Sequence, residues 1–129
     1  MMVTAITQGI KISVDTTYEE GYSDSANEHF MFAYRIEIQN LADFSIRLMR
    51  RKWVIFDSNG TQREVDGEGV VGEQPIINPG ESYNYVSGCN LKTEIGSMKG
   101  HYQMLRLSDE TLFNVDIPEF QLIAPYKLN

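Results

Sequence analysis

The sequence has 129 residues, of which 42% are hydrophobic and 22% are charged, and its formal net charge at pH 7 is −7. This length predicts a single domain, residues 1–129, with one hydrophobic core, and the ordinary composition excludes a disordered chain. The negative charge repels phosphate backbones, so we expect no binding to nucleic acid.

Alternating hydrophobic residues predict short strands through the first half of the chain. Residues 10–14 form the first, and an acidic stretch of residues 19–28, typical of a solvated loop, follows it. Residues 30–40 give the clearest strand, because every second residue is hydrophobic. Residues 44–49 alternate again, whereas residues 53–56 are hydrophobic throughout and indicate a separate strand covered on both faces.

Turn residues separate the predicted strands of the second half. Asn59-Gly60 favours a hairpin that leads into a returning strand at residues 61–65. Further strands are expected at residues 82–87, 98–107 and 112–117. Pro118 is expected to end the last of these, and residues 120–124 to form a final strand.

About eight short strands with turns between them predict an all-β fold. The best match is an antiparallel immunoglobulin/fibronectin-III-like β-sandwich of about seven to nine strands, and a β-barrel is the alternative. Eight residues are expected in its core: Phe32, Tyr34, Ile36, Trp53, Ile55, Tyr102, Met104 and Val115.

A glycine-rich stretch lies between the two halves. Gly67, Gly69 and Gly72 match the spacing G-x-G-x-x-G, which holds a pyrophosphate when it opens a helix. Pro75 and Pro79 follow too closely for a helix to begin there. We therefore expect no dinucleotide cofactor, and we interpret the glycines as positions of positive φ in a loop packed close to its own sheet.

The only concentrated positive charge consists of Arg47 and residues 50–52. This cluster could bind an anion or pair with the acidic residues of the central loop. It is more typical of exposed charges that alternate at a strand end.

The sequence contains few residues suited to catalysis or to metal binding. Cys89 is the only cysteine, so neither an intramolecular disulfide nor a multi-cysteine zinc site can form. A Cys89–His101 pair is conceivable, but an unpaired cysteine is more often an inert small residue. We expect no catalytic residues, no bound metal and no cofactor. The lack of a signal sequence or of a segment of about 20 apolar residues predicts a cytoplasmic protein without membrane contact.

Several motifs resemble those of the ApaG family of small bacterial proteins, whose domain also occurs in eukaryotic F-box proteins and in a protein that interacts with DNA polymerase delta. The resemblance covers nearly the whole chain and rests on Phe32–Tyr34, Trp53, Gly67–Pro75, Pro79–Glu81, Tyr85, Ser87–Gly88, Gly96, Met98, Gly100–Met104, Ile117–Pro118 and Phe120. It implies a fibronectin-III-like sandwich and an association with cobalt and magnesium resistance, and it supplies no accepted enzymatic activity or catalytic residues.

Two kinds of function fit these features. The first is a non-enzymatic module that binds another protein, as a monomer or a homodimer. The second is a binder of a small anion such as phosphate, pyrophosphate or a nucleotide, held by backbone amides between Gly67 and Gly72. Either function would use a candidate binding loop of Gly67, Glu68, Gly69, Gly72, Glu73 and Gln74, flanked by Arg50, Arg51 and His101. The alternative is that Glu68 and Glu73 only stabilise the loop.

Overall fold

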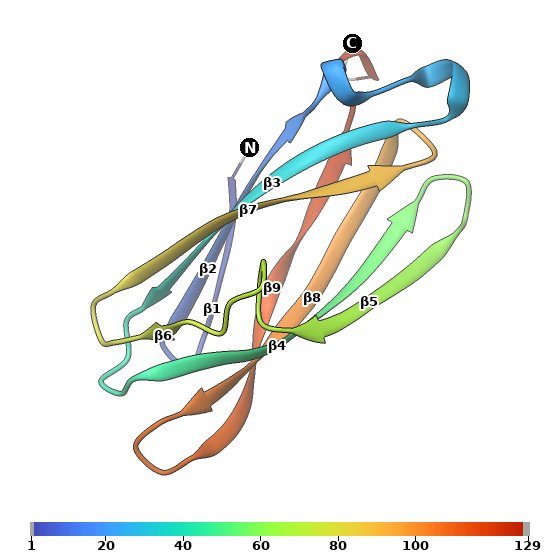
Figure 1. Cartoon of the computed structure of the whole chain (residues 1–129). Helices are drawn as coiled ribbons and strands as arrows, with labels where there is room; N and C mark the ends of the chain where they lie inside the picture. The colour runs from blue at the N-terminus through green and yellow to red at the C-terminus, as the bar shows by residue number, and fades with distance from the viewer. Residues whose placement is uncertain (1, 128–129) are drawn as a thin grey trace.

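The computed structural model describes residues 2–127, in which two antiparallel sheets pack face to face (Figure 1). The first sheet has the order β1 (Met2–Thr7), β2 (Ile10–Tyr18), β3 (Phe30–Asn40) and β7 (Ser82–Leu91). The second has the order β5 (Gln62–Glu68), β4 (Ile46–Asp57), β8 (Ile95–Arg106) and β9 (Thr111–Ile123), and β6 (Ile76–Ile77) pairs with part of β4. The predicted antiparallel β-sandwich is confirmed, with nine strands in this part of the chain.

Only short 3-10 helices accompany the strands of residues 2–127. The acidic stretch holds η1 (Glu20–Tyr22) and η2 (Ser25–Asn27), and η3 (Pro125–Lys127) follows the last strand. Within these residues, no helix has both the length and the hydrophobicity to cross a membrane.

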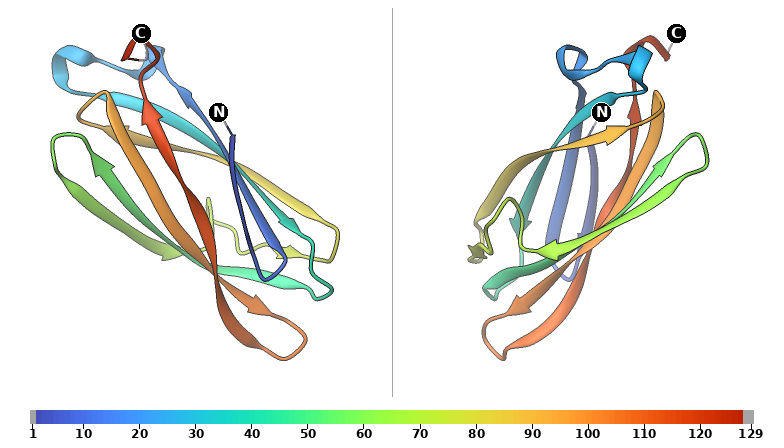
Figure 2. Two further views of the ribbon diagram at one scale, coloured as in Figure 1. Left: turned by 180° about the vertical axis from the view of Figure 1, so that it is seen from behind. Right: turned by 45° about the vertical axis from the view of Figure 1, so that its right-hand side comes forward.

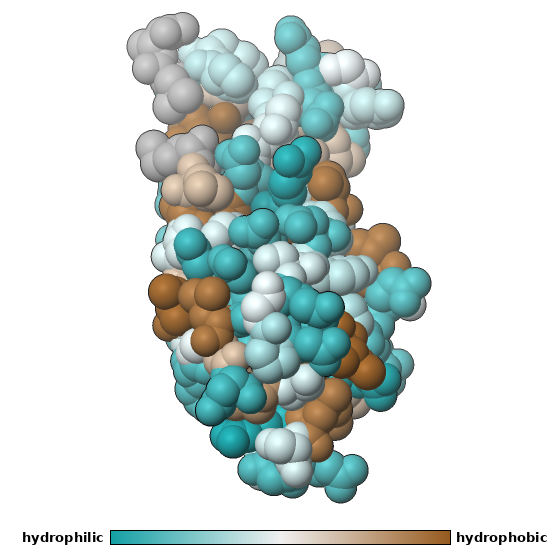
Figure 3. Space-filling model, turned by 90° about the vertical axis from the view of Figure 1, so that its left-hand side faces the viewer, coloured by the Kyte–Doolittle hydropathy of each residue, from teal (hydrophilic) through white to brown (hydrophobic). Residues whose placement is uncertain are grey.

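The core fills the space between the sheets. Hydrophobic side chains at alternate positions of most strands point inward, as the pleat of a strand requires, whereas β1 and β5 contribute no fully buried side chain. All eight residues that the sequence predicted for the core are buried, with exposed fractions from 0% to 6%. On the side of the molecule in Figure 3, the hydrophobic residues at the surface form separate patches with hydrophilic residues between them.

β4 is one strand, although the sequence predicted two segments. It is continuous because a β-bulge accommodates the change in hydrophobic pattern: Leu48 pairs with Met104 and Arg50 with Gln103, which leaves Met49 as the extra residue. The prediction that residues 53–56 are covered on both faces was wrong. Trp53 and Ile55 are buried, but Val54 and Phe56 lie on the outer face and are only half-buried.

β9 also continues where the sequence predicted an end, because Pro118 lies in a second bulge. Ile117 pairs with Gly100 and Phe120 with Met98, so two residues of β9 oppose one of β8. Proline is tolerated at such a position because a bulge interrupts the hydrogen-bond ladder. β1 was not predicted at all. It forms a hairpin with β2 through a turn in which Gln8 and Gly9 have φ of +49° and +83°.

The two long sides of the sandwich are built differently. On one side, here called the closed side, β9 packs against β1 and β2, and the Asp116 N–H donates to Thr7 Oγ1 at 3.2 Å. On the other, the open side, the outermost strands are β5 and β7, which do not pair with each other (Figure 2). The predicted binding loop follows β5 and lies on the open side.

Candidate binding site

The bulge at Met49 determines which basic side chains face the open side. Ile46 and Leu48 point into the sandwich, and the extra residue shifts the alternation so that Arg51 points inward together with Trp53. Arg50 and Lys52 consequently lie on the outer face of the sheet. The basic cluster of the sequence is therefore divided between two surfaces.

The glycine loop packs onto this bulge. The carbonyl oxygen of Met49 accepts hydrogen bonds from the Gly69 N–H at 2.9 Å and from Gln74 Nε2 at 3.0 Å. A Cβ on Gly69 would lie 2.0 Å from the Glu73 carbonyl oxygen, and φ at Gly69 is +57°. Glycine is needed there for both reasons, so the interpretation of a loop packed close to its own sheet agrees with the structure.

A tight turn forms the apex of the loop. Val70 and Glu73 exchange backbone hydrogen bonds of 2.8 and 2.9 Å, and φ is positive at both residues between them, +47° at Val71 and +78° at Gly72. The Val70 side chain is fully buried, whereas Val71 is 64% exposed. The loop thus places one valine in the core and presents the next one to solvent.

Arg51 supports the loop from below. Its Nη1 donates to the carbonyl oxygens of Glu68 and Gly69, both at 2.9 Å, and its guanidinium lies about 3.0–3.2 Å from where a Cβ on Gly67 would be. The carbonyl groups of this segment therefore face a cation. The N–H groups of Gly69, Val70 and Glu73 donate to other parts of the chain, so they are already engaged within the fold.

The three residues predicted to flank the loop lie close together. Arg50, Arg51 and His101 line one cavity of about 220 Å³. Arg50 forms an ion pair of 3.2 Å with Asp66, while His101 of β8 pairs with Lys52 in the register of the sheet. On this outer face the acidic residues of β5 run beside basic residues of β4, which agrees with the interpretation of the cluster as alternating exposed charges.

Buried tyrosines lie close to Arg51. The hydroxyls of Tyr85 and Tyr102 are 2.5 Å apart, and burial raises the pKa of both well above the usual value. Burial also raises the pKa of Tyr34, while a hydrogen bond with Ser87 lowers it in part. These groups remain protonated at neutral pH, so Arg51 carries an uncompensated positive charge beside neutral hydroxyls.

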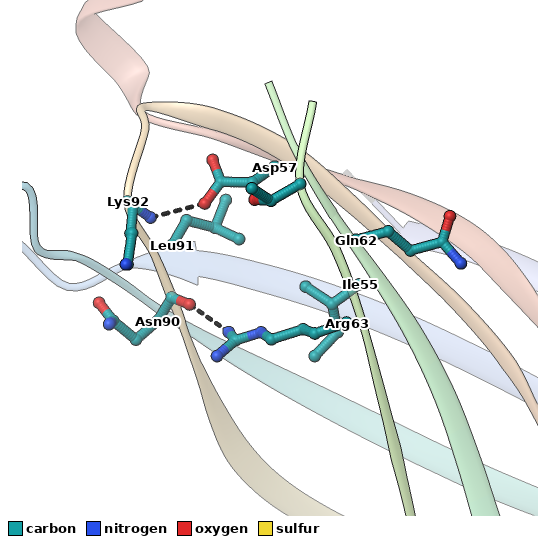
Figure 4. Close-up of a pocket in the computed structure, with 8 residues that line it drawn as sticks. Ile55, Asp57, Gln62, Arg63, Asn90, Leu91 and Lys92 are labelled. Atoms are coloured by element: carbon teal, nitrogen blue, oxygen red, sulfur yellow. Dashed lines mark hydrogen bonds between the residues drawn. The ribbon is translucent and has the colours of Figure 1, made fainter. Parts of the chain in front are cut away.

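A groove runs along the open side between β5 and β7. Two cavities of about 260 and 220 Å³ form it, and both are lined by Ile55, Arg63 and Asn90. Figure 4 shows the smaller cavity, where Arg63 extends from β5 and its Nη2 donates to the Asn90 carbonyl oxygen of β7. The same nitrogen lies 3.5 Å from Cys89 Sγ.

The larger cavity of the groove reaches between the two sheets. Its remaining lining comes from both sheets: Tyr34, Arg51, Trp53, Val65, Ser87, Gly88, Cys89 and Met98. Arg51 and Arg63 have no Asp or Glu carboxylate at salt-bridge distance among residues 2–127. The groove is therefore a basic surface on an acidic protein.

Cys89 and His101 belong to different sheets. Cys89 is buried in β7 and points into the sandwich, whereas His101 lies on the outer face of β8. Burial raises the pKa of the Cys89 thiol, and the nearby Arg63 only partly offsets this. The thiol is therefore mostly protonated, which makes it a weak nucleophile. Across residues 2–127, no three His, Cys, Asp or Glu side chains are grouped to hold a metal ion.

Comparison with known proteins agrees with these features. The family model described as the ApaG domain matches residues 20–106. This chain belongs to the ApaG family. It is 47% identical to Protein ApaG of Sinorhizobium fredii over 96% of this chain and 95% of that protein. It is 48% identical to Protein ApaG of Nitrosomonas eutropha, over 93% and 94% of the two chains.

A solved structure of this fold shows the same arrangement of strands. A crystal structure of a Bordetella pertussis protein is 38% identical to this ApaG-family chain and superposes with a TM-score of 0.86, over 90% of this chain and 94% of the other. The resemblance inferred from the motifs is therefore confirmed.

The structure adds two features to the predicted site that sequence reasoning missed. Val71 lies inside the predicted loop, yet its exposure follows only from the turn that it occupies. Arg63 lies in a strand of mostly exposed residues, and nothing in its sequence neighbourhood indicates that it reaches β7. Gln74, named in the candidate binding loop, turns its amide back to the bulge at Met49.

Proposed function

We propose that this ApaG-family chain is a non-enzymatic protein-interaction module whose contact surface is the apex of the loop of residues 69–74. The observation that carries the proposal is Val71, which is 64% exposed in a left-handed conformation, φ +47°. A β-branched residue is rare there, and the conformation costs about 1–2 kcal/mol.

Folding alone does not account for a valine at this position. Its side chain is largely exposed, and glycine or asparagine adopts the same backbone conformation at lower cost. Strained residues that the surrounding structure holds in place occur often at sites of function. A hydrophobic apex with the exposed carboxylates of Glu68 and Glu73 beside it is suited to contact with another protein.

The alternative, a small anion held by the amides of residues 67–72, has less support. The N–H groups of Gly69 and Val70 already donate within the chain, and the carbonyl oxygens of Glu68 and Gly69 line the side of the loop that Arg51 contacts. As an interaction module, the protein would act in the cytoplasm as a monomer or a homodimer. Any role in cobalt or magnesium resistance then passes through its protein partner.

The test is Val71→Asn, which keeps the left-handed turn and removes the hydrophobic apex. The matched control is Leu112→Asn on β9, whose side chain is 57% exposed. Immobilised variants are incubated with native lysate, and the retained proteins are identified by mass spectrometry.

We expect a specific partner to be lost with Val71→Asn and kept with Leu112→Asn, with no loss of melting temperature in Val71→Asn. Retention of every partner by Val71→Asn would contradict the proposal. Pyrophosphate titrated against the backbone amides of residues 67–72 tests the alternative, which predicts shifts in those amides.

A further inference from the structure

The groove between β5 and β7 carries features that the loop apex does not explain. We propose that it binds an extended segment of another protein that carries an acidic side chain. The segment adds to the free edge of β7, and its carboxylate binds Arg63. This inference rests on the proposed function of an interaction module, but it assigns a second surface and the chemistry of what binds there.

The backbone of β7 offers unused hydrogen-bonding groups. At one end of the groove the Asn90 carbonyl accepts from Arg63, and just past the strand the Lys92 N–H donates to Asp57 at 2.7 Å, both toward the open side. Peptide groups alternate in direction along a strand, so those of Val86 and Gly88 also point toward the open side.

These edge groups are accessible. The peptide groups of Val86 and Gly88 receive no hydrogen bond on this side from the rest of residues 2–127. The Val86 side chain is 55% exposed, and Gly88, without a side chain, leaves the backbone open. An extended segment can therefore pair with this part of β7, as in other cases of strand addition.

The charge of the groove selects an acidic segment. The guanidiniums of Arg63 and Arg51 have no carboxylate partner within the described residues, and the protein as a whole has a net charge of −7. The carboxylate of Asp57, which lies in the same groove, accepts hydrogen bonds from the Lys92 N–H and the Thr93 hydroxyl. An acidic segment is repelled by most of the surface and attracted here.

The shape of the groove favours the side chains of a strand over a free metabolite. Its two cavities of about 260 and 220 Å³ are each smaller than the roughly 300 Å³ at which small-molecule sites begin. Trp53 and Val65 give the larger cavity a hydrophobic wall, and Arg63 lines both cavities. Since alternate side chains of a strand point the same way, a segment of alternating acidic and hydrophobic residues fits this lining.

The test uses a defined probe, a blocked hexapeptide of alternating Glu and Val, titrated into the uniformly labelled protein and followed by NMR. The matched peptide has Lys in place of Glu. We expect the acidic peptide to shift the amides of Val86 and Gly88, and the Lys peptide to bind at least about ten-fold more weakly, because a charge-assisted hydrogen bond is lost and replaced by repulsion.

Variants locate the contact. Arg63→Gln is expected to weaken binding of the acidic peptide about ten-fold. Arg63→Lys should weaken it less, because lysine keeps the positive charge. Arg106→Gln, a matched control on another surface, should leave binding within about two-fold. Val86→Pro removes an outward N–H without breaking the ladder to β3, so it should abolish binding while the fold is retained.

Several results would overturn the inference. These are equal binding of the Glu and Lys peptides, no binding of either, or equal effects of Arg63→Gln and Arg106→Gln. A dimer in sedimentation that Val86→Pro dissociates would show that a second copy of the chain covers the edge instead. Val71→Asn separates the two proposals, because it should leave peptide binding unchanged. If that variant still retained every partner from lysate, only the proposal of a contact surface at the loop apex would be contradicted.

Discussion

The closed side and the open side of the sandwich cover the hydrophobic core in different ways. On the closed side β9 packs directly against β1 and β2, so hydrophobic strands cover the core. On the open side β5 and β7 are not paired, and the gap is filled by Val70 of the glycine loop and bridged by Arg63. Contacts made by a few side chains to backbone carbonyls leave a groove that strand packing would have closed.

Removing the large ring at the floor of the open side should have the greatest effect. Trp53 is 2% exposed, and its ring lies 5.4 Å from Tyr34 and 5.8 Å from Phe120. We expect Trp53→Ala to lower the free energy of unfolding by about 3–5 kcal/mol in urea titration. Val65→Ala, which changes the residue opposite it on β5, should cost well under half as much. A similar loss for both would mean that the exposed wall of the groove carries as much stability as its floor.

A single added Cβ atom at Gly69 should destabilise the glycine loop. Gly69→Ala combines an unfavourable φ with a Cβ 2.0 Å from the Glu73 carbonyl oxygen, and should cost about 2–5 kcal/mol. Gly72→Ala also has a positive φ, +78°, but its Cβ would meet nothing within 4 Å, so about 1–2 kcal/mol is expected. Thermal unfolding of the two variants separates the close approach from the backbone conformation. Equal losses would show that the loop does not close the open side tightly.

The buried hydroxyl pair on the open side should be coupled. Tyr85→Phe leaves the Tyr102 hydroxyl buried without its partner at 2.5 Å, and we expect a loss of about 1–3 kcal/mol. The double Phe variant should lose less stability than the sum of the losses in the two single variants, because no hydroxyl is then left unpaired. A double-mutant cycle from denaturant unfolding measures this coupling, and additive losses would contradict it.

The same pair predicts how stability depends on pH. Burial raises the folded-state pKa of Tyr85 and Tyr102 above the unfolded value near 10. Their stabilisation is therefore complete below pH 10 and is lost as the pH rises further, by up to about 1.4 kcal/mol per pH unit for each tyrosine. Unfolding curves between pH 9 and 11 test this, with the double Phe variant as control. The same steepness in that variant would assign the loss to other groups.

The smallest expected change has the opposite sign. Val71→Gly or Val71→Asn removes the unfavourable left-handed conformation of a valine. The free energy of unfolding should therefore stay the same or rise by up to about 1 kcal/mol, and the melting temperature should not fall. Differential scanning calorimetry measures it. A clear loss of stability would show that the apex valine serves the fold, and would remove the argument for an interaction surface there.

Much of the fold could be predicted because hydrophobic and polar residues alternate along a strand that has one buried face. Phe32, Tyr34 and Ile36 illustrate this, and all three are buried as predicted. The predictions failed where a bulge shifts the alternation, at Met49 and at Pro118, since the extra residue is visible only when the partner strand is known. The short β1 was missed because its hydrophobic pattern is weak.

For the candidate site, the sequence by itself determined the loop and its glycines, because positive φ and close packing demand glycine at particular positions. It also determined the family, through motifs spread along the chain. Only the tertiary structure decided that Arg51 points inward, that Val71 is exposed, and that Arg63 spans the gap to β7. The physical reason is that these outcomes depend on which residue of another strand lies opposite, and strand register is a property of the folded sheets.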